Sequence, residues 1–250
     1  MNLTNFSRRG TVTLSLLAGI ILWEIVGQNT HAAFMAPLSG TLLRLWQLVE
    51  DGQIVVQFLD SAALFLTGFA IAFLIGAPLG LLLARARLLR IGLEPYIMVL
   101  YGTPMVALIP FILSLMGFGF APKVLVVVLF AVFPILYNTI EGARSIKPEL
   151  LEVAYSFRSS EWALWREVMV PYTLPFTMTG VRQAIGRGLV GMVAAEFFLS
   201  STGLGQLIMT ASQNFDTAGV FANILIIGLL GVGLMRIGLT IEQHFARWRV

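Results

Sequence analysis

Cysteine is absent from this 250-residue chain, and charged residues are scarce. Without cysteine, the chain can form no disulfide, no cysteine-ligated zinc site and no thiol nucleophile. Charged residues make up 12% of the sequence and hydrophobic residues 58%. A soluble globular domain has roughly 25% charged residues, because water must wet its surface. The composition therefore excludes a soluble enzyme and a disordered chain, and it indicates a protein embedded in lipid.

The residue patterns of common catalytic sites are missing as well. Neither lysine, Lys123 or Lys147, follows a glycine, so the chain lacks the G-x-x-x-x-G-K-[ST] loop that holds the phosphates of ATP. The two histidines, His31 and His244, are far apart and give no two-histidine metal spacing. The predicted spans offer no plausible Ser-His arrangement for hydrolysis. We predict no catalytic residue, no metal site and no cofactor in this chain, and transport becomes the leading class of function.

Long uncharged runs divide the chain into six predicted membrane spans. A helix needs about 20 mostly apolar residues to cross a hydrocarbon core of roughly 30 Å. The predicted spans are residues 10–23, 61–84, 95–122, 124–140, 171–200 and 217–235, the third with a break near Gly117–Gly119. We interpret the first as a retained span, because no cleavage site of small residues follows it promptly. The predicted fold is all-α, a single polytopic transmembrane domain over residues 1–250.

The basic residues fall mostly on one side of these six spans. With the N-terminus in the cytoplasm, the inner side receives Arg8, Arg9, Arg85, Arg87, Arg90, Arg144, Lys147, Arg158, Arg166, Arg247 and Arg249, with Arg182 and Arg236 near inner helix ends. The outer side receives only Arg44 and Lys123, and Arg187 stays at membrane depth. The positive-inside rule then predicts that both termini are cytoplasmic.

The loop between the fourth and fifth spans, residues 141–172, is polar and has a helical pattern. Pro148 suits the first turn of a helix, and Glu149 and Glu152 favour the positive end of that helix. Its apolar residues at helical spacing are Leu150, Leu151, Ala154 and Phe157. A second short helix carries two tryptophans, and we expect Pro171 and Pro175 to stop it at the membrane entry. This helical pair lies either on the lipid headgroups or in a groove of another protein.

Several segments resemble the permease subunits of ABC importers. The segment 149–180, from Glu152-Val153-Ala154 through the Trp162 region to the Val-Pro-Tyr-Thr-Leu-Pro run, is similar to the EAA loop of that family. Residues 93–119 resemble its third span, and Ala195-Glu196 followed by Gly203-Leu204-Gly205 resembles the segment after its fifth span. Residues 37–52 and 61–80 resemble the branch that imports nitrate, sulfonates, taurine and thiamine-precursor pyrimidines.

The resemblance implies a function and a set of partners. It implies a permease subunit in the bacterial inner membrane, with six transmembrane helices and a cytoplasmic coupling loop. Two copies would form the path for a small, anionic or polar solute. A cytoplasmic ABC ATPase dimer, which binds the ATP, would dock inside, and a periplasmic or lipid-anchored substrate-binding protein would dock outside. No nucleic acid is expected among the partners.

The resemblance also assigns residues to the contact with the ATPase, namely Glu152, Ala154, Phe157, Arg158 and Trp162. Glu152 would interact with the ATPase, while Ala154 and Phe157 would fill its groove. Arg158 stands where the family usually has glycine, which serves a turn with φ > 0 at no steric cost. Arg158 would take that turn with strain or would pair with an acidic residue of the ATPase. Val153 replaces the usual alanine.

Small residues recur every four positions in two spans. They are Gly76 and Gly80 in the second span, and Gly180, Ala184 and Gly188 in the fifth. Small residues at this spacing let two helix backbones approach closely. We therefore assign these five residues to helix packing rather than to a transport path.

Polar residues inside the fifth span are the candidates for a translocation path: Gln183, Arg187 and Glu196. Ionisable residues at membrane depth are costly and usually face a partner or a wet cavity. Gln183 and Arg187 share a face, whereas Arg187 and Glu196 are about half a turn apart around the helix. Arg187 therefore either meets an anionic substrate or pairs with a residue elsewhere. A hydrated interfacial position is the simplest explanation for Glu196.

A secondary carrier or channel that acts without an ATPase is the alternative function. It has no need for a docking loop with tryptophans, and it usually shows internal repeats, which are not visible here. An intramembrane enzyme is a third class, but it lacks candidate residues.

Overall fold

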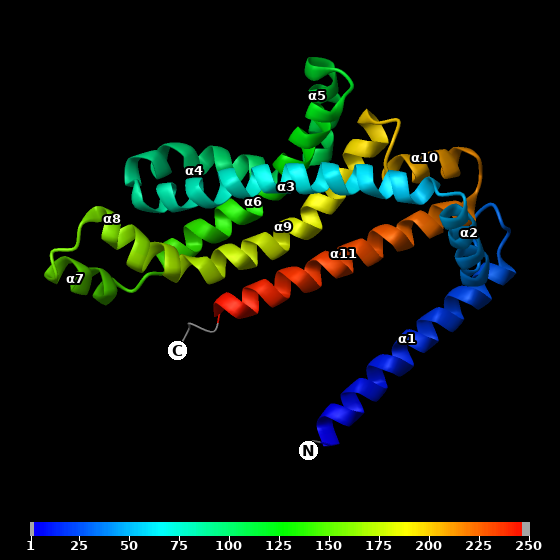
Figure 1. Cartoon of the computed structure of the whole chain (residues 1–250), viewed down its shortest axis with the longest axis horizontal. Coiled ribbons are helices and arrows are strands. Elements are labelled where there is room, and N and C mark those ends of the chain that lie inside the picture. The colour runs from blue at the N-terminus through cyan, green and yellow to red at the C-terminus, as the bar shows by residue number, and fades with distance from the viewer. Residues whose placement is uncertain (1–2, 247–250) are drawn as a thin grey trace. The chain divides into compact units, whose positions relative to one another are not determined.

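The computed structural model describes residues 3–246, and the described residues form helices joined by short loops, without a strand (Figure 1). Arg247 and Arg249, which contribute to the predicted charge asymmetry, lie outside the described residues. The chain divides into two compact units, one of residues 1–58 and 202–228 and one of residues 59–201 and 229–250.

Four of the described helices are long and apolar enough to cross a membrane. They are α1 (Leu3–Asn29), α3 (Gln53–Arg85), α6 (Phe120–Arg144) and α11 (Thr217–Ala246). Two further helix pairs, each bent at a short break, bring the number of candidate spans to six when each pair is counted as one span. The first pair is α4 (Arg87–Gly102) with η1 (Met105–Leu108) and α5 (Ile109–Met116), and the second is α9 (Val170–Leu199) with α10 (Leu204–Gln213). The prediction of an all-α polytopic fold is confirmed.

The unit of residues 1–58 and 202–228 is held by a small apolar core and by a carboxylate on α1. Its buried core residues are Leu48, Ile54, Leu204 and Ala222. The Glu24 carboxylate accepts hydrogen bonds from the Ser39 backbone N–H at 2.9 Å and from the Ser39 hydroxyl at 2.6 Å. Ser39 lies in the first turn of α2 (Leu38–Glu50), where the helix dipole favours a negative charge. The end of α1 is thus fixed to the start of α2.

The unit of residues 59–201 and 229–250 is built on α6 and α9, which pack against each other along most of their length (Figure 1). Its largest core joins them to α3 through buried residues such as Leu64, Phe65, Val127, Ala131, Ile135, Ala184 and Met192. These residues recur at helical spacing, so each of the three helices turns one apolar face toward this core.

The small residues assigned to helix packing lie at close helix contacts in this unit. A Cβ on Gly80 would lie 2.7 Å from the Thr139 Cβ, and one on Gly76 would lie 3.1 Å from the Val132 carbonyl oxygen. On α9, a Cβ on Gly180 would lie 2.7 Å from the Pro134 carbonyl oxygen, whereas Gly188 faces the Phe65 ring and Ala184 is fully buried. A larger side chain at Gly80 or Gly180 would therefore push α6 away from its neighbour.

The third span bends at a place that the sequence analysis missed. The helix axis turns by 95° between α4 and the η1–α5 segment, at Thr103 and Pro104. Proline disfavours the helical region for the residue before it, and Thr103 accordingly has extended backbone angles (φ −74°, ψ 136°). The predicted break near Gly117–Gly119 is also present, but it separates α5 from α6, which begins at Phe120 rather than at Val124.

The prolines at the start of the fifth span do not stop the preceding helix, which corrects the prediction made for Pro171 and Pro175. The helix runs on from α8 (Glu161–Ala163) through the π-helical segment η2 (Leu164–Met169) into α9. A proline ring collides with the carbonyl four residues earlier in a regular α-helix. A local change to π-helical hydrogen bonding accommodates such a proline in a membrane helix, and η2 contains Glu167, the residue four positions before Pro171.

Candidate functional site

The 141–172 loop folds into a small helical unit with its own core. Helix α7 (Pro148–Ser156) packs against η2 through a cluster of four buried residues: Ile146, Ala154, Leu164 and Met169. The Ser160 hydroxyl accepts a hydrogen bond from the Ala163 backbone N–H at 3.2 Å and so caps the start of α8. The loop is therefore an ordered structure that presents a defined surface.

Arg158 occupies a left-handed turn between α7 and α8, with φ at 52°. The Arg158 N–H donates to the Tyr155 carbonyl at 2.9 Å, and the Ser159 N–H donates to the Ala154 carbonyl at 3.1 Å. These two bonds form a Schellman motif, whose left-handed position is usually glycine. The expected turn with φ > 0 is present, and Arg158 adopts it.

The outer surface of this loop exposes large apolar side chains. Phe157 is 80% exposed and Trp162 is 73% exposed. Leu150, Val153 and Tyr155 of α7 are also exposed, as is the Glu152 carboxylate. Ala154 requires a correction, because it is only 8% exposed and packs inside the loop instead of being free to fill a groove of another protein.

Arg85, the last residue of α3, connects that helix to the 141–172 loop. One guanidinium nitrogen of Arg85 donates to the Glu161 carboxylate at 2.7 Å and to the Tyr155 hydroxyl at 3.2 Å. Tyr155 belongs to α7 and Glu161 to α8, so Arg85 binds both short helices at once. From the sequence alone, Arg85 indicated only the orientation of the chain in the membrane.

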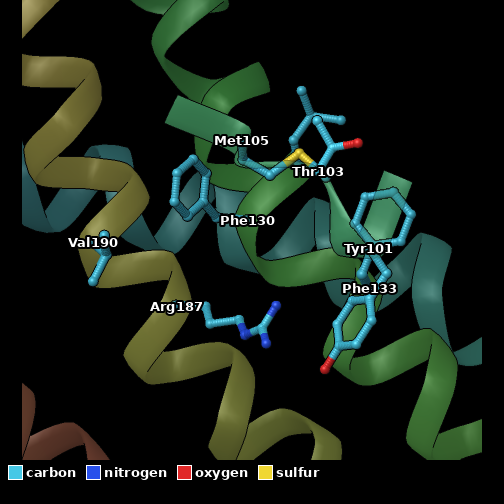
Figure 2. Close-up of a pocket in the computed structure, with 8 residues that line it drawn as sticks. Tyr101, Thr103, Met105, Phe130, Phe133, Arg187 and Val190 are labelled. Carbon is cyan, nitrogen blue, oxygen red and sulfur yellow. The ribbon is translucent and has the colours of Figure 1, made fainter. Parts of the chain in front are cut away.

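A cavity of about 220 Å³ lies where the third span bends (Figure 2). It is lined by residues from the end of α4, the break, η1, α6 and α9: Tyr101, Thr103, Met105, Leu129, Phe130, Phe133, Arg187 and Val190. Figure 2 shows Arg187 reaching from α9 toward Tyr101 and Phe133. Among the residues that line this cavity, Arg187 alone carries a charge, and most of the others are apolar.

The Arg187 guanidinium lies over an aromatic ring. Its central carbon is 4.6 Å from the centroid of the Tyr101 ring, within the range of a cation–π contact. The other neighbour of Tyr101 is Tyr137, whose ring is stacked at a centroid distance of 5.9 Å and an interplanar angle of 5°. Among the described side chains, Arg187 has no hydrogen bond and no ion pair, whereas Arg182, on the same helix, lies 2.9 Å from the Glu242 carboxylate.

Gln183 lies on the same exposed face of α9 as Arg187. Its side-chain oxygen is 3.5 Å from the Asn138 side-chain nitrogen on α6, and Asn138 also donates to the Pro134 carbonyl at 2.8 Å. The amides of Asn138 and Gln183 and the guanidinium of Arg187 therefore lie on one polar face formed by α6 and α9.

The chain matches a known transport family. The family described as binding-protein-dependent transport system inner membrane component matches residues 76–247, which include the 141–172 loop and every residue of the Arg187 cavity. The chain belongs to this family. It is the multi-pass permease subunit of an ABC transport system, so the prediction of an ABC-importer permease is confirmed over the alternative of a secondary carrier or channel.

The permease is similar over most of its length to transport permeases whose names give different solutes. A riboflavin transport system permease of Chloroflexus aurantiacus is 34% identical over 239 residues, which cover 95% of this chain and 88% of that protein. A bicarbonate transport system permease of Synechococcus elongatus is 28% identical, with 93% and 87% coverage. A structure of the inward-facing MetNI methionine ABC transporter shares the fold, with a TM-score of 0.68 at 17% identity over 78% of this chain and 97% of that one.

Glu196 of the permease does not join Gln183 and Arg187. It is 1% exposed and accepts a hydrogen bond from the Ser61 hydroxyl of α3 at 2.6 Å. The hydrated interfacial position predicted for Glu196 is therefore wrong. A buried carboxylate with a hydrogen-bond donor is typical of a structural contact between helices, in this case between α3 and α9.

Tyr101 was not predicted as the neighbour of Arg187, because the partners considered were a carboxylate, carbonyl groups, water or an anion, and no aromatic ring. One signal was available: the Thr103-Pro104 pair interrupts an apolar run directly after Tyr101. Interrupted helices at membrane depth often line binding sites in transporters.

Proposed function

We propose that two copies of the permease form an import path for a small anionic or polar solute, and that Arg187 supplies positive potential in that path. The observation that carries this proposal is the exposed Arg187 in the middle of α9, whose guanidinium makes a cation–π contact with Tyr101 and, among the described side chains, no hydrogen bond or ion pair. An arginine at membrane depth costs about 2.5–3.5 kcal/mol on insertion scales. A cation–π contact returns only about 0.5–2 kcal/mol.

The remaining cost requires water or an anion near Arg187. A guanidinium carries five N–H donors, and contact with a ring face leaves its N–H edge free. A passing anion bound at that edge would gain charge-assisted hydrogen bonds. Gln183 and Asn138 on the same face extend the polar surface along α6 and α9.

The test of the path is Arg187→Gln in the permease reconstituted with its ATPase and binding protein. Because glutamine keeps a polar group but removes the charge, we expect dimer assembly and basal ATP hydrolysis to persist while uptake falls at least about tenfold, the effect of losing roughly one charge-assisted contact. Arg187→Lys keeps the charge and should retain part of the uptake. Failure of the glutamine variant to assemble would make Arg187 a structural residue.

We propose that the partner ATPase, which binds the ATP, docks on the exposed surface of the 141–172 loop. Phe157 and Trp162 supply exposed aromatic area of the kind that anchors protein interfaces. Val153 widens this apolar surface, and Glu152 and Arg158 add charges at its border. An apolar surface rimmed by polar groups is typical of a protein-binding site.

Glu152→Lys tests the docking surface. The residue is exposed in a loop outside the predicted spans, so the variant should insert into the membrane normally. We expect weaker co-purification of the ATPase and loss of uptake, because the change reverses a charge at the border of the interface. Uptake that persists when the ATPase is deleted would refute the coupling itself.

We further propose the orientation and the outer partner. Both termini are cytoplasmic, and a substrate-binding protein delivers the solute from outside the inner membrane. The clustering of basic residues at one end of the predicted spans supports this orientation, and membership of the binding-protein-dependent family supports the outer partner.

A further inference from the structure

The walls of the Arg187 cavity are made mostly of aromatic and thioether groups. Tyr101, Phe130 and Phe133 supply rings, and Met105 supplies a thioether beside them. The Thr103 hydroxyl donates to the Val99 carbonyl at 2.7 Å, so its hydrogen is already used. The donor side chains left in the lining are the Arg187 guanidinium and the Tyr101 hydroxyl.

This lining is unsuited to a small hydrated inorganic anion. Such an ion gives up its water only where several polar groups replace the lost hydrogen bonds. The cavity instead offers one cation, one phenol and a large apolar surface. It therefore matches a ligand with one charged group attached to an apolar body.

The apolar body that fits best is a planar ring. Aromatic groups attract one another at centroid distances of about 4.5–7 Å, and flat conjugated groups also stack on a guanidinium. Tyr101 already contacts two planar groups, the Tyr137 ring at 5.9 Å and the Arg187 guanidinium at 4.6 Å. A second flat molecule thus meets rings whose positions are fixed before it arrives.

The size of the cavity limits the ligand. Its volume of about 220 Å³ is below the range of roughly 300–1,000 Å³ that is typical of sites for drug-sized molecules. One or two fused rings fit within this volume. The bend at Thr103 and Pro104 borders this space, since Tyr101 of α4, Thr103 at the break and Met105 of η1 all line it.

We propose that this cavity is a selectivity site for a planar, conjugated anion of one or two rings, with the acidic group on Arg187 and the ring against Tyr101 and Phe133. This proposal rests on the proposed function, in which Arg187 lines the transport path. It adds that the permease itself, and not only an external binding protein, discriminates between solutes.

Two sulfonates of equal charge provide the test. Binding of radiolabelled benzenesulfonate and ethanesulfonate to the complete transporter in nanodiscs is measured by equilibrium dialysis, without nucleotide or binding protein. We expect benzenesulfonate to bind about tenfold more tightly, because only it has a ring for the aromatic walls. Benzyl alcohol, which has the ring but no charge, should compete weakly.

Variants then assign the preference to residues. Tyr101→Leu should lower the ratio of the two affinities toward one with little change for ethanesulfonate, whereas Tyr101→Phe should keep the ratio. Arg187→Gln should weaken both sulfonates. Phe111→Leu is the matched control, since Phe111 is exposed on α5 and lies outside the cavity lining, and it should change neither affinity.

Equal affinity for the two sulfonates, or no binding of either, would overturn the selectivity site. Both results would leave the importer function standing, because that function is measured separately as ATP-dependent uptake with the binding protein present. A preference for benzenesulfonate that survives Tyr101→Leu would also overturn the assignment to this cavity.

Discussion

Arg158 shows how a single residue can retain a turn that ordinarily uses glycine. Its backbone has φ at 52°, and an L-residue in that region loses roughly 1–2 kcal/mol relative to the right-handed region. The two Schellman hydrogen bonds and the packing of Ala154 hold the turn in place despite this strain.

Replacing Arg158 separates the strain from the charge. Arg158→Gly removes the strain, so the permease should gain about 1 kcal/mol of stability, measured as a higher midpoint of thermal unfolding in detergent. Arg158→Ala keeps the strain and removes the charge, so it should give no gain. If the side chain pairs with the ATPase, both variants weaken co-purification equally. A glycine variant less stable than the alanine variant would contradict this account.

Single residues also show where sequence reasoning ends. The repeat of small residues at Gly76, Gly80 and Gly180 predicted close helix contacts, because that signal is local. The burial of Glu196 could not be predicted, because its hydrogen-bond donor, Ser61, is 135 positions away on another helix. The neighbour of Arg187 was missed for the same reason, since Tyr101 lies on a different span.

At the scale of elements, hydropathy and charge located the spans, but proline had opposite effects in two of them. Pro104 ends α4, because it forces Thr103, the residue before it, into an extended conformation that cannot continue the helix. Pro171 and Pro175 do not end the helix, and for Pro171 the carbonyl four residues earlier belongs to Glu167 in the π-helical η2. A proline therefore marks a possible break, and the adjoining helix geometry decides whether the break forms.

Arg85 provides an element-scale prediction about coupling. The Arg85–Glu161 ion pair is partly exposed, with side-chain exposures of 36% and 65%, so its loss should change stability by no more than about 1 kcal/mol. It nevertheless links α3 to both short helices of the 141–172 loop. We therefore expect Arg85→Ala to keep ATP hydrolysis while the solute moved per ATP falls, as measured in proteoliposomes.

A charge exchange tests whether the Arg85 pair itself is responsible. Arg85→Glu combined with Glu161→Arg should restore much of the lost coupling. Arg87→Ala is the control, because Arg87 is exposed nearby and forms no ion pair among the described side chains. Similar loss of coupling in Arg87→Ala would show that the positive charge of the region, rather than this contact, matters.

At the scale of the whole molecule, the six spans give a topology that reporter fusions can check. With both termini cytoplasmic, fusions at Asn29 and Asn214 should report an outside location, and fusions after Arg90 and Arg158 an inside location. The reason is that the basic residues near Arg90 and Arg158 resist translocation across the membrane. A cytoplasmic signal at Asn214 would remove one span from this topology.

The segments α8, η2 and α9 form one continuous helix. A movement at the α8 end of this helix would therefore also displace its α9 end. Trp162, on the surface proposed for the ATPase, and Arg187, in the cavity, lie on the same continuous helix, about 37 Å apart at 1.5 Å per residue. A tilt of about 10° at the docking end would sweep the far end through roughly 6 Å over that length. The α9 wall of the cavity, together with α6 packed along it, would then move relative to the wall built by η1. With the ATPase docked as proposed, motion at the loop would reach the Arg187 cavity through the displacement of one continuous helix.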